Sequence, residues 1–196
     1  MISSSLTENS SMKMTQRALF ASLLVLSLAA SAASLLKTDT AKTSVSAVFK
    51  QMSVPVESKF KTFNIAIDYN PQAPGAASAK VEIDTASLDL GEAEMNKEVA
   101  KKEWFNSSQY PKATFVSNSI KPVSPGKLSV TGKLTIKGKT ADVSFPLTVK
   151  TDAGKQVFEG MLPIKRLAFN IGEGEWKDTS MVADEVTIKF RVTAAP

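Results

Sequence analysis

The sequence predicts an all-β domain, built either as an antiparallel sandwich or as a closed barrel. Three observations lead to this fold class. Apolar and polar residues alternate in six or more segments, turn-forming Gly, Pro and Asn residues lie between these segments, and only one segment has a helical pattern. The alternation does not by itself separate a sandwich from a barrel, because both place one face of every strand inside.

The chain begins with a segment typical of a secretory signal peptide. Residues 18–30 are an apolar run of 13. Lys13 and Arg17 precede this run, and the small residues 30–32 lie at its end. A transmembrane helix needs about 20 apolar residues, so the run is too short to cross a bilayer. We therefore predict export through the inner membrane, cleavage near Ala32 and a periplasmic location. A retained N-terminal anchor is the alternative.

The mature protein is predicted to be one domain of residues 33–196, preceded by a signal peptide of residues 1–32. The stretch before Met12 contains Glu8 but no basic residue, whereas a signal peptide starts with a basic region. Met12 or Met14 is therefore the better initiator.

In the first half of this domain, strands are predicted to precede a short helix. The alternation indicates strands near residues 44–51, 62–69 and 79–84. The helix is predicted over about residues 91–103, where acidic side chains fall in the first turn and lysines in the last. We expect the helix to pack near the sheet.

The second half shows the most regular strands. Residues 139–150 alternate almost without a break, and residues 128–136 keep one apolar face with Gly132 at the centre, which is typical of a bulge or a close approach. Further strands are predicted near residues 157–164 and 185–192. The apolar face of the most regular strand consists of Ala141, Val143, Phe145, Leu147 and Val149.

Composition excludes several kinds of function. The chain has no cysteine and no histidine, so it contains neither a thiol nucleophile nor the imidazole and thiolate ligands of common zinc and copper sites. The net charge of +5 is spread along the chain, without the dense basic patch of a nucleic-acid reader. We therefore predict no enzyme activity, no metal, no cofactor and no nucleic-acid partner.

Five segments, in this order and at this spacing, resemble the YceI family of exported, lipocalin-like proteins that bind polyisoprenoids. The similarity covers roughly residues 38–194. The segments are 81–88 (VEIDTASL), Trp104-Phe105, 110–115 (YPKATF), 132–138 (GKLTIKG) and 166–171 (RLAFNI).

The resemblance implies an eight-stranded antiparallel barrel with one short helix near an opening. It also implies an elongated apolar cavity for an isoprenoid tail, such as that of ubiquinone or a polyprenyl phosphate. Eight strands leave room for about one slender ligand. The leading hypothesis is therefore a periplasmic carrier of an isoprenoid lipid or quinone.

The sequence departs from the common family pattern in two places. The segment between Leu88 and Trp104 lacks the family's acidic, histidine-bearing stretch, and residues 169–171 read Phe-Asn-Ile where the family often has Phe-Gly-Ile. The departures resemble a subgroup that accompanies, or is fused to, a cytochrome b561 membrane domain. This implies a second hypothesis, an accessory module that docks on a b-type cytochrome. A serine hydrolase is a third and less favoured hypothesis.

The inward-facing apolar side chains are the predicted ligand-binding residues, with ordinary core packing as the alternative for each. Trp104 and Phe105 are expected at the mouth of the cavity. The full set is Phe63, Ile65, Ile67, Val81, Ile83, Trp104, Phe105, Phe115, Leu134, Ile136, Phe145, Leu147, Ile164, Ile188 and Phe190.

Three polar or aromatic features near the C-terminus have two interpretations each. Lys165 and Arg166 would either contact a lipid head group or form a solvated pair. Trp176 would either cover an opening or pack locally. The acidic residues from Glu173 to Asp178 would either bind a cation or form a solvated loop.

Overall fold

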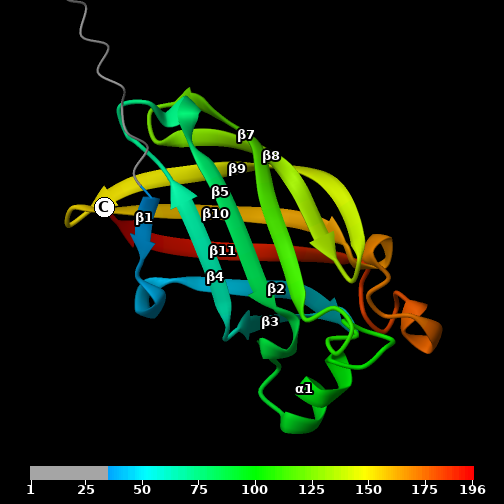
Figure 1. The fold of residues 1–196 in the computed structure, drawn as a ribbon. Coiled ribbons are helices and arrows are strands. Elements are labelled where there is room, and N and C mark those ends of the chain that lie inside the picture. The colour runs from blue at the N-terminus through cyan, green and yellow to red at the C-terminus, as the bar shows by residue number, and fades with distance from the viewer. Residues whose placement is uncertain (1–34) are drawn as a thin grey trace, which may run out of the picture. The chain divides into compact units, whose positions relative to one another are not determined.

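Eight antiparallel strands form a closed barrel in the computed structural model, which describes residues 35–196 (Figure 1). The strand order around the barrel is β1-β4-β5-β7-β8-β9-β10-β11, and β11 pairs with β1 to close the ring. The eight strands are β1 (Leu35–Thr38), β4 (Phe63–Asp68), β5 (Ser78–Asp84), β7 (Lys112–Ser124), β8 (Lys127–Ile136), β9 (Lys139–Asp152), β10 (Lys155–Lys165) and β11 (Glu185–Ala195). The predicted eight-stranded antiparallel barrel is confirmed. The predicted signal peptide lies outside the described residues.

Three further strands extend the wall of the barrel at one end. They are β2 (Ser44–Gln51), β3 (Val54–Phe60) and β6 (Leu88–Asp89), and the hydrogen-bonded order continues from β11 through β2 and β3 to β6. The β2–β3 pairing keeps nearly the same register as the β1–β4 pairing. Strand β2 therefore continues β1, and β3 leads into β4, each across a short break. The sequence predicted β2 but not β1, β3 or β6.

One short α-helix and five 3-10 turns make up the remaining regular structure of the described chain. The helix α1 (Ala93–Val99) is shorter than the predicted 91–103, because the chain after Val99 folds into turns whose amides donate back to Glu98 and Lys101. No helix in residues 35–196 is long and apolar enough to cross a membrane. The turns are η1 (Thr40–Lys42), η2 (Pro74–Ala76), η3 (Thr85–Ser87), η4 (Arg166–Phe169) and η5 (Gly174–Lys177).

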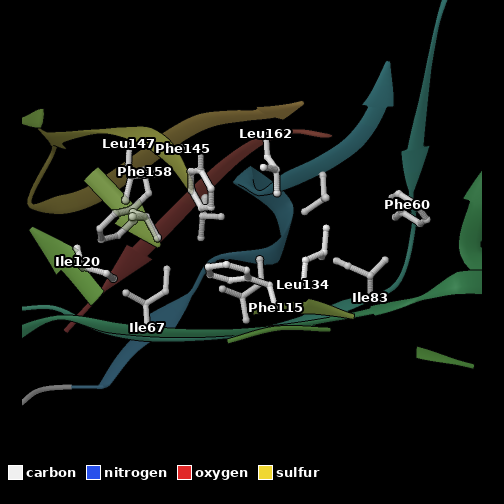
Figure 2. Close-up of a cluster of buried hydrophobic side chains, with 14 of the residues drawn as sticks. Phe60, Ile67, Ile83, Phe115, Ile120, Leu134, Phe145, Leu147, Phe158 and Leu162 are labelled. Carbon is white, nitrogen blue, oxygen red and sulfur yellow. The ribbon is translucent and has the colours of Figure 1, made fainter. Parts of the chain in front are cut away.

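The inward faces of the strands form one apolar core. In β8 every second residue from Leu128 to Ile136 is buried, which is the pattern expected of a strand with one dry face. Figure 2 shows side chains from opposite walls, such as Phe115 and Phe145, pointing toward one another. The parity of the predicted strands therefore identified the inside of the barrel correctly.

Two inward-facing glycines make room for aromatic rings. A Cβ built on Gly132 would lie 2.5 Å from the ring of Phe115 and 2.4 Å from the carbonyl oxygen of Val116. A Cβ on Gly160 would lie 2.5 Å from the ring of Phe190. Only glycine allows these rings to lie flat against the wall, and the close approach predicted at Gly132 is confirmed.

Replacing Gly132 by alanine should destabilise the barrel, because the new methyl group meets backbone as well as a ring. We expect Gly132→Ala to lower the free energy of unfolding by about 1–3 kcal/mol in urea denaturation. Gly75→Ala is the matched control: its Cβ would make only one ordinary contact, at 3.7 Å from Pro122, and a change within about 0.5 kcal/mol is expected. Equal effects of both changes would contradict the argument.

Candidate functional site

Two adjoining apolar cavities occupy the barrel. The first, called here the inner cavity, has a volume of about 130 Å³ and is lined by side chains that include Ile67, Tyr69 and Phe158. The second, the helix-side cavity, has a volume of about 200 Å³ and is lined by residues of α1, η4 and η5 as well as by strands. Both are lined almost entirely by hydrocarbon and aromatic groups, so they suit an apolar ligand.

The two cavities lie next to each other along the barrel, because they share part of their walls. The shared residues come from β2, β5, β7, β8 and β11, so the boundary is formed by strands around the ring. They are Val45, Ile83, Ala113, Leu134 and Ile188. Movement of a few apolar side chains at this boundary would join the cavities into one elongated space.

The structure places fourteen of the fifteen predicted site residues in the walls of these cavities. Phe63 is the exception. It packs against the core but lines a separate depression with Thr40 and Lys59, because it lies at the start of β4, where β3 and η1 adjoin it. Whether the fourteen residues contact a ligand stays a prediction. In the helix-side cavity they are Ile83, Trp104, Phe105, Leu134, Ile136, Ile164 and Ile188.

Sequence reasoning missed part of the inner wall. Ile120 belongs to β7, whose alternation is broken by a register shift between Ser117 and Ser119. Phe158 lies in the irregular β10 and contacts Tyr69 edge-on, with ring centroids 5.2 Å apart. Burial raises the pKa of the Tyr69 hydroxyl, so this phenol stays neutral over a wide pH range.

Three phenylalanines cross the inner cavity in contact with one another. Phe145 lies between Phe115 and Phe190, and both pairs of ring centroids are 5.6 Å apart. Phe115 and Phe145 are labelled in Figure 2. Aromatic pairs at this distance attract one another beyond their area burial. The rings therefore form one connected aromatic part of the inner cavity wall.

Two tryptophans line the helix-side cavity. The rings of Trp104 and Trp176 have centroids 5.3 Å apart and are tilted by 52°. The indole nitrogen Nε1 of Trp104 is the one buried side-chain polar atom without a hydrogen-bond partner among the described residues. A buried donor without an acceptor is costly, so this indole nitrogen is an uncompensated polar group beside the cavity.

Arg166 is a structural residue rather than a head-group contact. Its side chain is 1% exposed, and its N–H groups donate to the carbonyl oxygens of residues 171, 172, 176, 182 and 183 at 2.7–3.3 Å. All five donors of the guanidinium are used, which contradicts both interpretations from the sequence. Burial lowers the pKa of Arg166, and the guanidinium carbon lies 5.8 Å from the ring centroid of Trp104. Lys165, by contrast, is exposed and lies 3.8 Å from Asp184.

Lys137 is a second buried cation that the sequence did not reveal. It donates to the carbonyl oxygens of Lys102 and Asn170 and to a carboxylate oxygen of Glu173, at 2.6–2.8 Å. The bond to Lys137 lowers the pKa of Glu173, whose side chain is 40% exposed. Glu173 therefore pairs with a buried cation from the surface, while Glu175 and Asp178 are exposed, as expected of a solvated acidic loop. No group of acidic residues that could hold a metal ion occurs in the described part of the chain.

Comparison with known proteins decides the family. The sequence profile of the YceI-like domain matches residues 36–194. The chain belongs to the YceI-like family. Association with a cytochrome b561 subgroup stays a prediction.

Solved structures and curated relatives agree with this assignment. The YceI-like chain is 53% identical to BcnA of Burkholderia cenocepacia, with a TM-score of 0.79 over 81% of this chain and 100% of that one. It is 33% identical over 115 residues to a UPF0312 protein of Pseudomonas putida, a match that covers 59% of this chain and 57% of the relative. A polyisoprenoid binding domain of Saccharophagus degradans shares the fold, with a TM-score of 0.62 at 17% identity over 83% of this chain and 98% of that one.

Removing the Arg166 guanidinium should unfold this end of the barrel. We expect Arg166→Ala to lower the free energy of unfolding by roughly 3 kcal/mol or more, since five carbonyl groups lose a charged donor. Chemical denaturation measures the change. Arg191→Ala is the control, because Arg191 is a half-exposed partner of Glu159 and its loss should cost at most about 1 kcal/mol. A loss no greater than that of Arg191→Ala would show that Arg166 does not hold η4 and η5.

Proposed function

We propose that the protein is a periplasmic carrier that binds an isoprenoid lipid, with the tail inside the barrel and without covalent chemistry. One observation carries the proposal: the closed barrel encloses two adjoining apolar cavities. Each methylene group transferred from water to such a space contributes about 0.8 kcal/mol. A long tail therefore needs few hydrogen bonds to bind tightly.

The comparisons and the sequence support the ligand class and the location. The Saccharophagus degradans domain that shares this fold is described as polyisoprenoid binding. The predicted signal peptide supports a periplasmic protein, since the apolar run and the small residues after it are typical of export. An absence of enzyme activity and docking on a b-type cytochrome stay predictions from composition and resemblance.

The polar end of the lipid would lie in the helix-side cavity. Trp104 offers an indole N–H without a partner there, and Arg166 has no donor left for an anion. A carbonyl or hydroxyl oxygen accepts one hydrogen bond from an indole. Between the two ligands implied by the resemblance, this arrangement favours a quinone over a polyprenyl phosphate.

Analysis of the lipid that accompanies the protein tests the carrier function. Protein purified from its native host is denatured, and its extract is examined by mass spectrometry; we expect a stoichiometric isoprenoid lipid. Ala113→Phe should lose this lipid, because Ala113 lies in the wall shared by both cavities. Val116→Phe is the matched control in the same strand, since Val116 is exposed on the outer face. Wild-type protein that repeatedly carries no such lipid would overturn the proposal.

The role of Trp104 can be separated from packing by comparing two ligands. Trp104→Phe keeps an aromatic ring but removes the N–H, so we expect about tenfold weaker binding of a ubiquinone, measured by fluorescence or calorimetric titration. Binding of squalene, a hydrocarbon of similar tail chemistry, should stay within about twofold. Trp176→Phe is the control and should not discriminate between the two ligands. Equal losses for both ligands in Trp104→Phe would assign Trp104 to packing alone.

A further inference from the structure

Exposed apolar side chains gather at the helix-side end of the barrel. The described residues include eight large apolar side chains that are exposed, and four of them lie at this end. Met52 (74% exposed) and Val54 (62% exposed) form the tip of the β2–β3 hairpin, while Met181 and Met95 lie on neighbouring elements. Exposed apolar groups that cluster usually mark a binding surface.

Hydrogen bonds place the hairpin tip against the segment after η5. The amide of Met52 donates to the carbonyl oxygen of Met181 at 2.8 Å, and Gln51 forms a bridge with Val182. In Figure 1 the end of β2, the orange η4–η5 region and α1 lie at the same end of the barrel, away from the C-terminus. The four exposed side chains are called here the apolar rim.

The wall of the helix-side cavity continues into the apolar rim. Phe49 and Gln51 line this cavity, and the register pairs them with Val56 and Val54 across the hairpin. Residues directly opposite in an antiparallel pair point to the same side of the sheet. The cavity wall therefore runs out along the hairpin to Val54. On another side of the opening, Met95 both lines the cavity and is exposed.

The backbone of the hairpin tip is unusual for the residues it contains. Met52 and Ser53 both have positive φ, of 49° and 68°, where glycine or asparagine is normally preferred. A bulky, exposed methionine in this conformation gains nothing from core packing. Such a costly choice is typical of a position selected for an external contact.

The charges around the apolar rim are mixed: Glu92 is exposed near Met95, and Glu175 and Asp178 are exposed before Met181. The acidic side chains Glu94 and Glu98 of α1 each form an ion pair with a lysine. Lys50 is exposed next to the hairpin tip, and the chain carries a net charge of +5. Because positive and negative charges are mixed at this end, the apolar tip carries the contact with a lipid surface, since it partitions into the boundary between head groups and acyl chains.

We propose that the helix-side end docks on a membrane surface through Met52, Val54, Met95 and Met181. An isoprenoid tail would then pass between the bilayer and the helix-side cavity without crossing water. This inference rests on the proposed carrier function. A protein partner is less suited to the rim, because four side chains fall short of the roughly 800 Å² per partner that a stable interface covers.

Co-sedimentation with vesicles tests the docking. The mature protein, residues 33–196, is mixed with vesicles of phosphatidylethanolamine and phosphatidylglycerol that contain no isoprenoid lipid. We expect Met52→Glu and Val54→Glu each to lower the partition coefficient about fivefold or more. Met161→Glu is the matched control, because Met161 is equally exposed on β10, outside the rim, and should change the coefficient by less than about twofold.

Each result of this experiment has a defined meaning. The docking proposal would be overturned if wild-type protein failed to sediment with vesicles or if Met161→Glu had an equal effect. It would also be overturned by a protein partner that is captured only with Met52 and Val54 intact. Thermal unfolding of every variant excludes misfolding as the cause. Because the vesicles lack isoprenoids, docking can succeed even if lipid extraction shows that the carrier function is wrong. Conversely, a lipid-loaded protein that ignores vesicles would leave the carrier function and remove only the docking.

Discussion

The closure of the barrel by β1 and β11 is the constraint on which the rest of the structure depends. Lys37 and Thr38 pair with the end of β11, and the amide of Asp39 donates to the carbonyl oxygen of Thr193. This short contact is reinforced by the hydrogen bond from the Thr193 amide to the Thr43 hydroxyl and by the ion pair of Lys155 with Asp39. Without closure, both sheet edges would be exposed and the apolar interior would face water. Because the ring closes, the inward faces of the strands must share one narrow space.

That narrow space explains why two glycines lie beside aromatic rings in its wall. An eight-stranded barrel is just wide enough to be filled by its own side chains or to hold one small ligand. Gly132 and Gly160 let the rings of Phe115 and Phe190 lie back against the sheet. Methyl groups at these two glycines would push the rings inward. Cavity volume in this protein therefore depends on two missing side chains as much as on the apolar residues present.

The sequence revealed the strands whose side chains alternate and missed those that break the rule. The β8–β9 hairpin was predicted because every second residue lies on the apolar face from Leu128 to Ile136 and again from Ala141 to Leu147. Strand β7 was not, because a register shift and Pro122 interrupt its pattern. The residues of the cavity wall could be predicted from the alternation along the strands, whereas the structural role of Arg166 could not. Its partners are backbone carbonyls up to seventeen residues away, which no side-chain pattern encodes.

The elements around the helix-side opening differ in how firmly they are held, and this difference sets the route into the barrel. Arg166 and Lys137 fix η4, η5 and the segment between them through buried, charge-assisted hydrogen bonds. The helix α1 has only seven residues, none of them buried, and its ion pairs are exposed. Displacing η5 breaks the hydrogen bond from Arg166 to the carbonyl oxygen of Trp176, whereas no residue of α1 accepts a bond from Arg166 or Lys137. A tail would enter between α1 and the β2–β3 hairpin, where the cavity wall already reaches the surface.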